Sequence, residues 1–321
     1  MDSLFTSPEF QMSLLLFVAL GGYLIASRIN QSAVIGLILV GLLVGPSMLG
    51  WITYTDFVRG LAHLGAVILL FVIGLEFNVK EILSLRNGVI AAVGVIIPWI
   101  GGYWLSLIFG YDMPSAIFIG TALTATSIAI TANVLREMGK LQTEAAKAII
   151  GAAVIDDVLS LLALAISTDV VSGTVTAGGI ALVAVKAVAF IIIGGAFGIF
   201  VVSKYVSKLD ETGFCRKFPE FIFIFAMMVA FLYAMCAEAV GLSAIVGAFI
   251  AGVSFESVEL SHSKNFREGA EYLQIIFASI FFVSLGIIAD LHQVTPEIVL
   301  FLVALTVVAI ITKVIGCGIP A

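Results

Sequence analysis

Charged residues are scarce in this sequence. Only 11% of its 321 residues are Asp, Glu, Lys or Arg, whereas 61% are hydrophobic and the mean hydropathy is +1.21. Because soluble domains contain about 25% charged residues, this composition excludes an ordinary soluble protein and predicts a membrane protein. A spanning helix uses about 20 apolar residues, so little of the chain remains for a soluble domain.

Cysteine and clustered basic residues are also sparse. The cysteines at positions 215, 236 and 317 lie far apart and form no CxxC motif, which argues against a disulfide framework or a zinc site. No basic domain or face is present, so nucleic acid is not an expected partner. The N-terminus contains Asp2 and Glu9 but no basic segment. The first apolar run is therefore predicted to be a retained span rather than a cleaved signal peptide.

Apolar runs between polar breaks predict an all-α polytopic membrane protein with about eleven spans. The predicted spans are 12–27, 33–50, 60–77, 88–109, 114–135, 146–167, 177–203, 220–240, 242–255, 270–289 and 296–318. Pro98 lies deep inside one of them and predicts a kink, because proline lacks the backbone N–H that a helix interior needs.

Basic residues gather in alternate loops. One set of loops contains Arg28, Lys80, Arg86, Arg136, Lys140, Lys147, Lys204, Lys208, Arg216, Lys217, Lys264 and Arg267. In the other set Arg59 is the only basic residue. Because cytoplasmic loops are enriched in Lys and Arg, this alternation places the N-terminus outside a multi-pass plasma-membrane protein.

An internal repeat is visible at an offset of 211 residues. The segment SAVIGLILVG at 32–41 recurs as SAIVGAFIAG at 243–252, and the Phe-Val pair at 71–72 recurs at 282–283. Six predicted spans precede the single span at 177–203, so the second copy enters the membrane from the opposite face. Such inverted repeats are typical of secondary transporters.

The repeat also predicts how the chain is divided. The first six-helix unit covers 1–168, a connecting transmembrane helix covers 177–204, and a second unit covers 220–321. A full copy of the first unit would continue beyond position 321. We therefore expect a C-terminally incomplete chain containing about 11 of 13 spans.

Among the charged residues inside predicted spans, Asp156, Asp157 and Lys313 are the candidates for function. Asp156 and Asp157 are adjacent in mid-span, where each ionised carboxylate costs roughly 2.5–3.5 kcal/mol. Neighbours on a helix point about 100° apart, so we expect the two acids to have different partners. Lys313 in the last span is the natural partner for one of them; the alternative is that its ammonium reaches the cytoplasmic interface.

Hydroxyl side chains are concentrated in TALTATSIAIT at 121–131. They belong to Thr121, Thr124, Thr126, Ser127 and Thr131. Such side chains stabilise interrupted helices, offer oxygen ligands to a dehydrated cation, or simply allow helices to pack closely.

Taken together, these segments resemble the cation:proton antiporter superfamily. The likeness is to its second subgroup, which contains NapA-like sodium/proton antiporters and the Kef potassium/proton systems. It rests on VIGLILVGLLVGP (34–46), LGAVILLFVIGLEF (64–77), GTALTATSIAIT (120–131), IIGAAVIDDVLSL (149–161), LSAIVGAFIAG (242–252) and the lysine of TKVIG (312–316). The resemblance therefore extends over nearly the whole chain.

The resemblance implies an inverted-repeat antiporter fold with two discontinuous helices that cross near the membrane midplane, a dimerisation scaffold and a mobile core. Asp157 would be the carboxylate that binds the proton or Na+, and Asp156 would be the partner of Lys313. Asp156 and Lys313 would form a salt-bridge switch. The stretch from Thr121 to Thr131 would be the first broken helix and line the ion site. The second broken helix would fall near 333–343, beyond this chain.

The implied activity is transport rather than enzymatic catalysis, with no cofactor. We expect an electrogenic antiporter that exchanges cytoplasmic Na+ or Li+ for external H+ by alternating access in a prokaryotic plasma membrane. Its partners would be the lipid bilayer, monovalent cations, protons and a second copy in a homodimer. The alternative is a Kef-type potassium/proton antiporter, although Kef systems usually lack the first aspartate of the pair. An intramembrane aspartyl protease would need a GxGD motif and a potassium channel a TVGYG filter, and both are absent.

Overall fold

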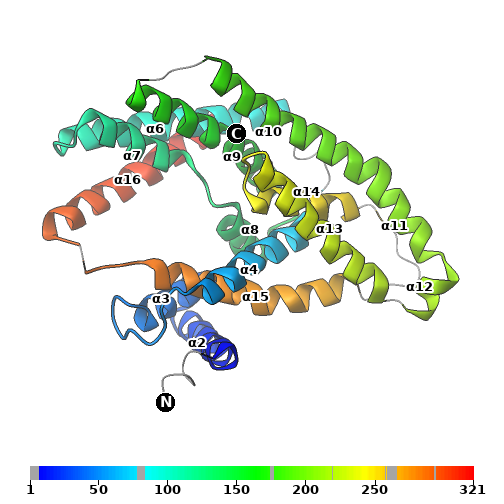
Figure 1. Cartoon of the computed structure of the whole chain (residues 1–321). Helices are drawn as coiled ribbons and strands as arrows, with labels where there is room; N and C mark the ends of the chain where they lie inside the picture. The colour runs from blue at the N-terminus through cyan, green and yellow to red at the C-terminus, as the bar shows by residue number, and fades with distance from the viewer. Residues whose placement is uncertain are drawn as a thin grey trace.

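The computed structural model describes residues 7–77, 84–173, 177–218, 220–256, 258, 266–292 and 294–321. Lys80 and Lys264, two of the predicted cytoplasmic basic residues, lie outside this part. All regular elements in the described residues are helices. Figure 1 shows their arrangement.

The helices follow the apolar runs of the sequence. In chain order they are α2 (Pro8–Ile29), α3 (Ala33–Val44), α4 (Asp56–Gly74), α6 (Leu85–Ile108), α7 (Met113–Thr124), α8 (Ile128–Glu137), α9 (Glu144–Ser172), α10 (Ala177–Phe197), the π-helical turn η1 (Gly198–Val202), α11 (Ser203–Asp210), α12 (Gly213–Lys217), α13 (Glu220–Ala239), α14 (Ala244–Glu256), α15 (Phe266–Ile288) and α16 (Pro296–Gly318). Within the described residues, nine helical segments are long and apolar enough to cross a membrane, and α3 and α14 are shorter apolar helices.

Some helix ends differ from the predicted spans for identifiable reasons. The helix predicted over 33–50 ends at Val44 because Pro46 disfavours helical geometry at the residue before it. The span predicted over 177–203 continues as helix through η1 and α11 to Asp210. The basic residues of α11 end the apolar run but not the helix, since hydrogen-bonded backbone does not require apolar side chains.

The described helices pack in two groups (Figure 1). Helices α2, α3, α4, α13, α14 and α15 contact one another and form one group, which we call the scaffold. Helices α6, α7, α9 and α16 form the second group, the core bundle. Helix α10 contacts both α9 and α14, and α8 contacts both α9 and α4. These two helices therefore connect the groups.

Glycines allow the scaffold helices to pack closely, and the same glycine contact occurs in two helix pairs. A Cβ on Gly36 of α3 would overlap the carbonyl oxygen of Gly22 in α2 and lie against Ala26. A Cβ on Gly247 of α14 would meet the carbonyl oxygen of Tyr233 in α13 and lie against Ala237. Each of the three residues in the second contact lies 211 positions after its counterpart in the first, which is the offset seen in the sequence. The α2–α3 and α13–α14 pairs therefore have the same contact.

The same relation holds between α3 and α15 and between α14 and α4. A Cβ on Gly41 would overlap the backbone of Val283 and Gly286, whereas a Cβ on Gly252 would overlap the backbone of Phe71 and Gly74. Only a residue without a side chain allows backbones to approach so closely. Each short helix therefore packs on the long helix of the other half of the scaffold.

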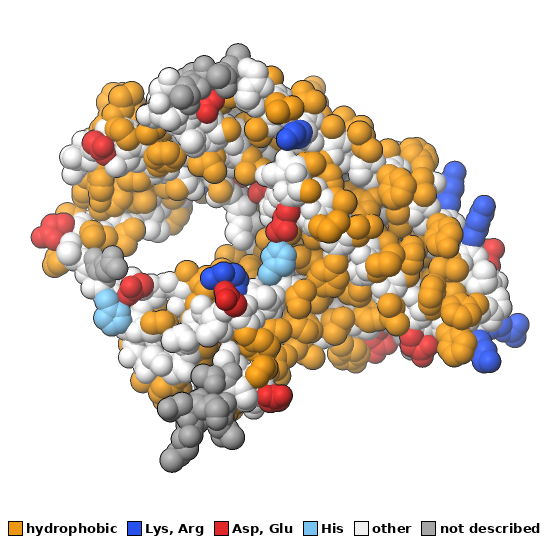
Figure 2. Space-filling view, viewed as in Figure 1, with side chains coloured by type: hydrophobic (Ala, Val, Ile, Leu, Met, Phe, Trp, Pro, Cys, Tyr) orange, Lys and Arg blue, Asp and Glu red, His pale blue; other side chains and the backbone are white. Residues whose placement is uncertain are grey.

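The outer surface is apolar along α10 and α16. In α10 and α16 only 6% of the most apolar window is buried within the protein, and Figure 2 shows hydrophobic side chains over much of this face. Lys and Arg side chains gather where α11 and α12 lie. Such a surface is stable in lipid, where apolar side chains need no cover from protein.

Candidate functional site

Helix α9 holds the adjacent aspartates in the core bundle. It begins at a Thr143 cap, whose hydroxyl oxygen accepts from the backbone N–H of Ala146, and it passes through the buried small residues Gly151 and Ala153 before the two acids. These small side chains allow neighbouring helices to approach. The side chain of Asp156 is only 5% exposed, so its carboxylate requires partners within the protein.

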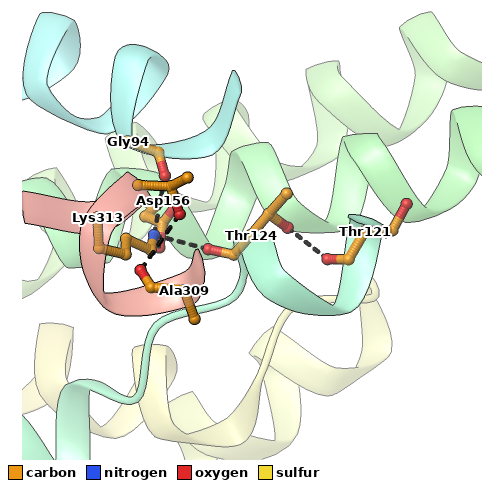
Figure 3. Close-up of polar contacts among 7 residues, drawn as sticks. Gly94, Thr121, Thr124, Asp156, Ala309 and Lys313 are labelled. Atoms are coloured by element: carbon orange, nitrogen blue, oxygen red, sulfur yellow. Dashed lines mark hydrogen bonds and ion pairs between the residues drawn. The ribbon is translucent and has the colours of Figure 1, made fainter. Parts of the chain in front are cut away.

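Lys313 of α16 reaches Asp156 and two backbone carbonyls (Figure 3). Its Nζ lies 3.5 Å from Asp156 Oδ2, and it donates to the carbonyl oxygens of Gly94 at 2.9 Å and Thr124 at 2.8 Å. The ammonium has three hydrogens to donate, and three acceptors surround it. The lysine therefore lies inside the bundle rather than at the membrane interface.

The two carbonyls are available for identifiable reasons. Gly94 lies four residues before Pro98 in α6, and proline has no N–H to donate to the carbonyl at that spacing. Thr124 is the last residue of α7, and the final carbonyls of a helix have no partner within it. Lys313 thus pairs with backbone oxygens that the local sequence leaves open.

The predicted broken helix is interrupted between α7 and α8. Ala125 is extended, with φ of −64° and ψ of 132°, and the helix resumes after Ser127, whose hydroxyl oxygen accepts from the N–H of Ile130. Thr126 lies in this interruption, near the Asp156 carboxylate. The unwound segment therefore lies against the aspartates, an arrangement seen at ion sites of transporters.

The other hydroxyls of the stretch are used within the protein. Thr121 donates to the carbonyl of Ile117 and shares a 2.6 Å hydrogen bond with Ser167 of α9. Thr124 donates to the carbonyl of Thr121, so it offers its backbone oxygen rather than its side chain. Thr131 lies within the first turn of α8, beyond the interruption. Thr126 is the predicted lining residue whose hydroxyl lies near the Asp156 carboxylate.

Asp157 points to a different partner from Asp156. The backbone amide of Ser243, directly before α14, lies near its carboxylate. A helix N-terminus favours a negative charge. The acids of one helix therefore face different groups of helices: Asp156 faces Lys313 in the core bundle, and Asp157 faces the scaffold.

A cavity of about 310 Å³ reaches Ser243 from the surface of the scaffold. Its lining includes Arg59, His63 and Glu238, and His63 Nε2 lies 3.9 Å from Glu238 Oε1. Both of these side chains are about half exposed. The cavity therefore leads from water toward the residue whose amide contacts Asp157.

A second polar network lies at the other end of α8. Arg136 pairs with Glu271 of α15 at 3.2 Å, lies 3.9 Å from Glu76 at the end of α4, and hydrogen-bonds to Gln274. Glu76 and Glu271 also line a cavity of about 340 Å³. Glu76 thus belongs to a network that ties α8 to the scaffold.

Three buried oxygens beside the aspartates have no hydrogen-bond partner among the described residues: Asp156 Oδ1, Asp157 Oδ2 and Ser160 Oγ. Two carboxylates and one ammonium also leave the group with a net negative charge when all are ionised. Buried oxygens of this kind fit a small hard cation or a proton. The described residues contain no cluster of three His, Cys, Asp or Glu side chains that would hold a metal.

Some of these residues were not identified from the sequence. Ser160 lies four residues after Asp156, and that spacing could have placed it on the same helix face. The carbonyl of Gly94 could have been located from Pro98. No sequence signal places the amide of Ser243 beside Asp157, because that contact depends on the packing of two distant helices.

Comparisons with known proteins agree with this architecture. Residues 14–319 match the family described as "Sodium/hydrogen exchanger, transmembrane". The chain is 33% identical to the Na(+)/H(+)-K(+) antiporter GerN of Bacillus cereus, over 97% of this chain and 79% of GerN. It is 34% identical to the probable Na(+)/H(+) antiporter GerT of the same organism, over 92% of this chain and 78% of GerT.

The fold is also that of a solved antiporter. The sodium proton antiporter MjNhaP1 of Methanocaldococcus jannaschii superposes with a TM-score of 0.66 at 15% identity, over 96% of this chain and 78% of that structure. With its apolar surface, interrupted helix and buried charges, the chain belongs to the sodium/hydrogen exchanger family, and it is a multi-pass membrane antiporter of monovalent cations and protons, not an enzyme.

Proposed function

We propose that this protein is an electrogenic antiporter that moves Na+ or Li+ out of the cytoplasm in exchange for external H+. The observation that carries the proposal is the pair of carboxylates on α9, each with one buried oxygen that has no hydrogen-bond partner among the described residues. Relatives whose names specify sodium/proton exchange support the choice of ions.

Competition for Asp157 provides the exchange. A deprotonated Asp157 binds the cation, and a protonated one does not. A carboxylate that binds neither a proton nor a cation stays charged, and moving that charge through the low-dielectric interior of the membrane is energetically costly. The site therefore crosses between the two sides only when it is loaded, which makes the protein an exchanger rather than a channel.

Asp156 and Lys313 make the exchange electrogenic in this proposal. When the cation binds to both carboxylates it displaces Lys313 from Asp156, and the released lysine gives up its proton. More than one proton is then exchanged for each cation. One net charge crossing the membrane gains about 2.3 kcal/mol per 100 mV of potential, which drives export against a gradient.

Orientation and assembly follow from the charge pattern and the repeat. The basic loops lie in the cytoplasm and the N-terminus lies outside, in a prokaryotic plasma membrane. The inverted-repeat units are residues 1–168 and 220–321, connected by the helix at 177–204. The repeated glycine contacts of the scaffold support this division. The scaffold is also the surface through which two copies form a homodimer.

Potassium/proton exchange is the second candidate, because the name of GerN includes K+ as well as Na+. The adjacent aspartates favour sodium. The two candidates differ in the cation that drives proton movement, so one assay separates them.

Proton flux in everted membrane vesicles tests the proposal. Na+ and Li+ added to vesicles containing the wild-type protein should each dissipate part of the imposed proton gradient. Asp157→Asn should abolish the response to both cations. Glu144→Gln is the matched control, since Glu144 lies on the same helix with its side chain 90% exposed, and it should retain full activity. Undiminished sodium-driven flux in Asp157→Asn would refute the site, and a response to K+ alone would establish the second candidate.

A further inference from the structure

We propose that the hydroxyl of Ser160 is a third side-chain ligand of the transported cation and sets its affinity. The inference rests on the proposed function, because it concerns the same site. It assigns to Ser160 a role that neither the sequence pattern nor the aspartate pair specifies.

The first observation is that Ser160 departs from the behaviour of other hydroxyls in these helices. The buried side chains of Ser106, Ser254 and Ser279 each donate to the carbonyl four residues earlier in their own helix. Ser160 is 9% exposed, and its Oγ has no partner among the described residues. A buried hydroxyl without a partner is rare in native proteins and calls for a functional explanation.

The second observation is where this hydroxyl lies. Ser160 follows Asp157 by three residues and Asp156 by four, and side chains at both spacings are neighbours on a helix surface. The three unpartnered oxygens thus lie within about one turn of α9. They belong to three different side chains, so a cation between them can be bound from more than one direction.

The chemistry of a hydroxyl suits this position. Hard cations bind oxygen ligands, and a serine adds one without adding charge. A third carboxylate would require a second cation or proton for neutralisation, whereas a neutral oxygen leaves one cation sufficient. Together with the two carboxylates, this hydroxyl provides oxygen ligands that a dehydrated Na+ or Li+ needs.

Sodium-driven proton flux in everted vesicles, measured over a series of Na+ and Li+ concentrations at a fixed alkaline pH, tests the role of Ser160. Ser160→Ala should raise the apparent KM for Na+ about tenfold, equivalent to about 1.4 kcal/mol. Its maximal rate should stay within about twofold of wild type, because the proton-loaded return step does not use the hydroxyl. Ser106→Ala, the same exchange at a buried serine that bonds to its own helix, should leave KM unchanged.

A second pair of variants separates coordination from packing. Ser160→Thr and Ser160→Val have nearly the same shape, but only threonine retains the hydroxyl. KM for Na+ should be lower in Ser160→Thr than in Ser160→Val by about tenfold. This comparison remains available if Ser160→Ala fails to fold.

The outcomes distinguish this inference from the proposed function. If the wild-type protein shows no cation-driven flux, the proposed function fails. The role of Ser160 is refuted if the wild type is active and Ser160→Ala has the same KM for Na+ as the wild type. It is also refuted if Ser160→Thr and Ser160→Val have the same KM for Na+. A displaced pH profile with an unchanged KM at alkaline pH would also refute it, because the hydroxyl would then bind the proton-loaded carboxyl instead of the cation.

Discussion

The pairing of Lys313 with Asp156 makes a quantitative prediction about stability. At a separation of 3.5 Å the two charges attract by roughly 5 kcal/mol if the effective dielectric constant is about 20. An asparagine at position 156 still offers a neutral oxygen to the ammonium. The attraction lost in Asp156→Asn is therefore the charge-assisted part of the contact, about 2 kcal/mol.

Removing the lysine should cost more than removing the acid. After Asp156→Asn the ammonium keeps its two carbonyl acceptors, Gly94 and Thr124. After Lys313→Met both carbonyls lose their donor and Asp156 loses its cation, so the expected cost is about 3–5 kcal/mol, as for other broken buried ion pairs. The double variant should be more stable than additivity predicts by about 2 kcal/mol.

Reversible unfolding in mixed detergent micelles, applied to both single variants and the double variant, measures this coupling. The matched control is the pair of Glu144 and Lys147, which lie 3.7 Å apart at the start of α9, with the Glu144 side chain 90% exposed. Their coupling should be below about 0.5 kcal/mol, because Glu144 is solvated. A coupling between Asp156 and Lys313 as small as this control, or a larger cost for Asp156→Asn than for Lys313→Met, would refute the reasoning.

Two further predictions concern the backbone around the site and in the scaffold. Gly252→Ala should lower the free energy of unfolding by about 2 kcal/mol or more, because its Cβ would overlap the backbone of α4. Gly195→Ala in α10, where a Cβ meets nothing within 4 Å, should be neutral or stabilising by about 0.5–1 kcal/mol. Pro98→Ala should supply an N–H for the carbonyl that Lys313 now binds, so in this background Lys313→Met should cost about 1.5 kcal/mol less.

The same unfolding measurement checks both predictions. Equal stabilities for Gly252→Ala and Gly195→Ala would show that the close helix contact is not required. An unchanged cost of Lys313→Met in the Pro98→Ala background would show that the carbonyl of Gly94 does not help to hold the ammonium.

Much of the fold could be predicted because the membrane restricts the options. Backbone groups in lipid must bond within a helix, so long apolar runs identify helices, and the span predicted at 296–318 matches α16. Helix ends at the membrane surface are less restricted. The helix predicted to end at 203 reaches Asp210, because water tolerates a continuing polar helix as readily as a loop.

The candidate site was only partly accessible from the sequence. Charged residues in a span are conspicuous, so Asp156, Asp157 and Lys313 could be singled out. Hydroxyls are ambiguous, since Thr121 and Thr126 look alike in sequence although one bonds within its helix and the other faces the acids. Backbone partners are harder still, because an amide or a carbonyl is present at nearly every position and only packing decides which is available.

In the proposed exchange, the adjacency of the two acids couples ion binding to movement. Because Asp156 and Asp157 point in different directions, the first bonds within the core bundle to Lys313 and the second faces the amide of Ser243 in the scaffold. In the proposed exchange, a proton or cation on Asp157 neutralises the carboxylate that faces the scaffold, and so weakens its attraction to the N-terminus of α14. The core can then move relative to the scaffold when loaded and is held when empty. A single aspartate at either position could bind an ion, but only the adjacent pair connects the occupancy of the site to both groups of helices at once.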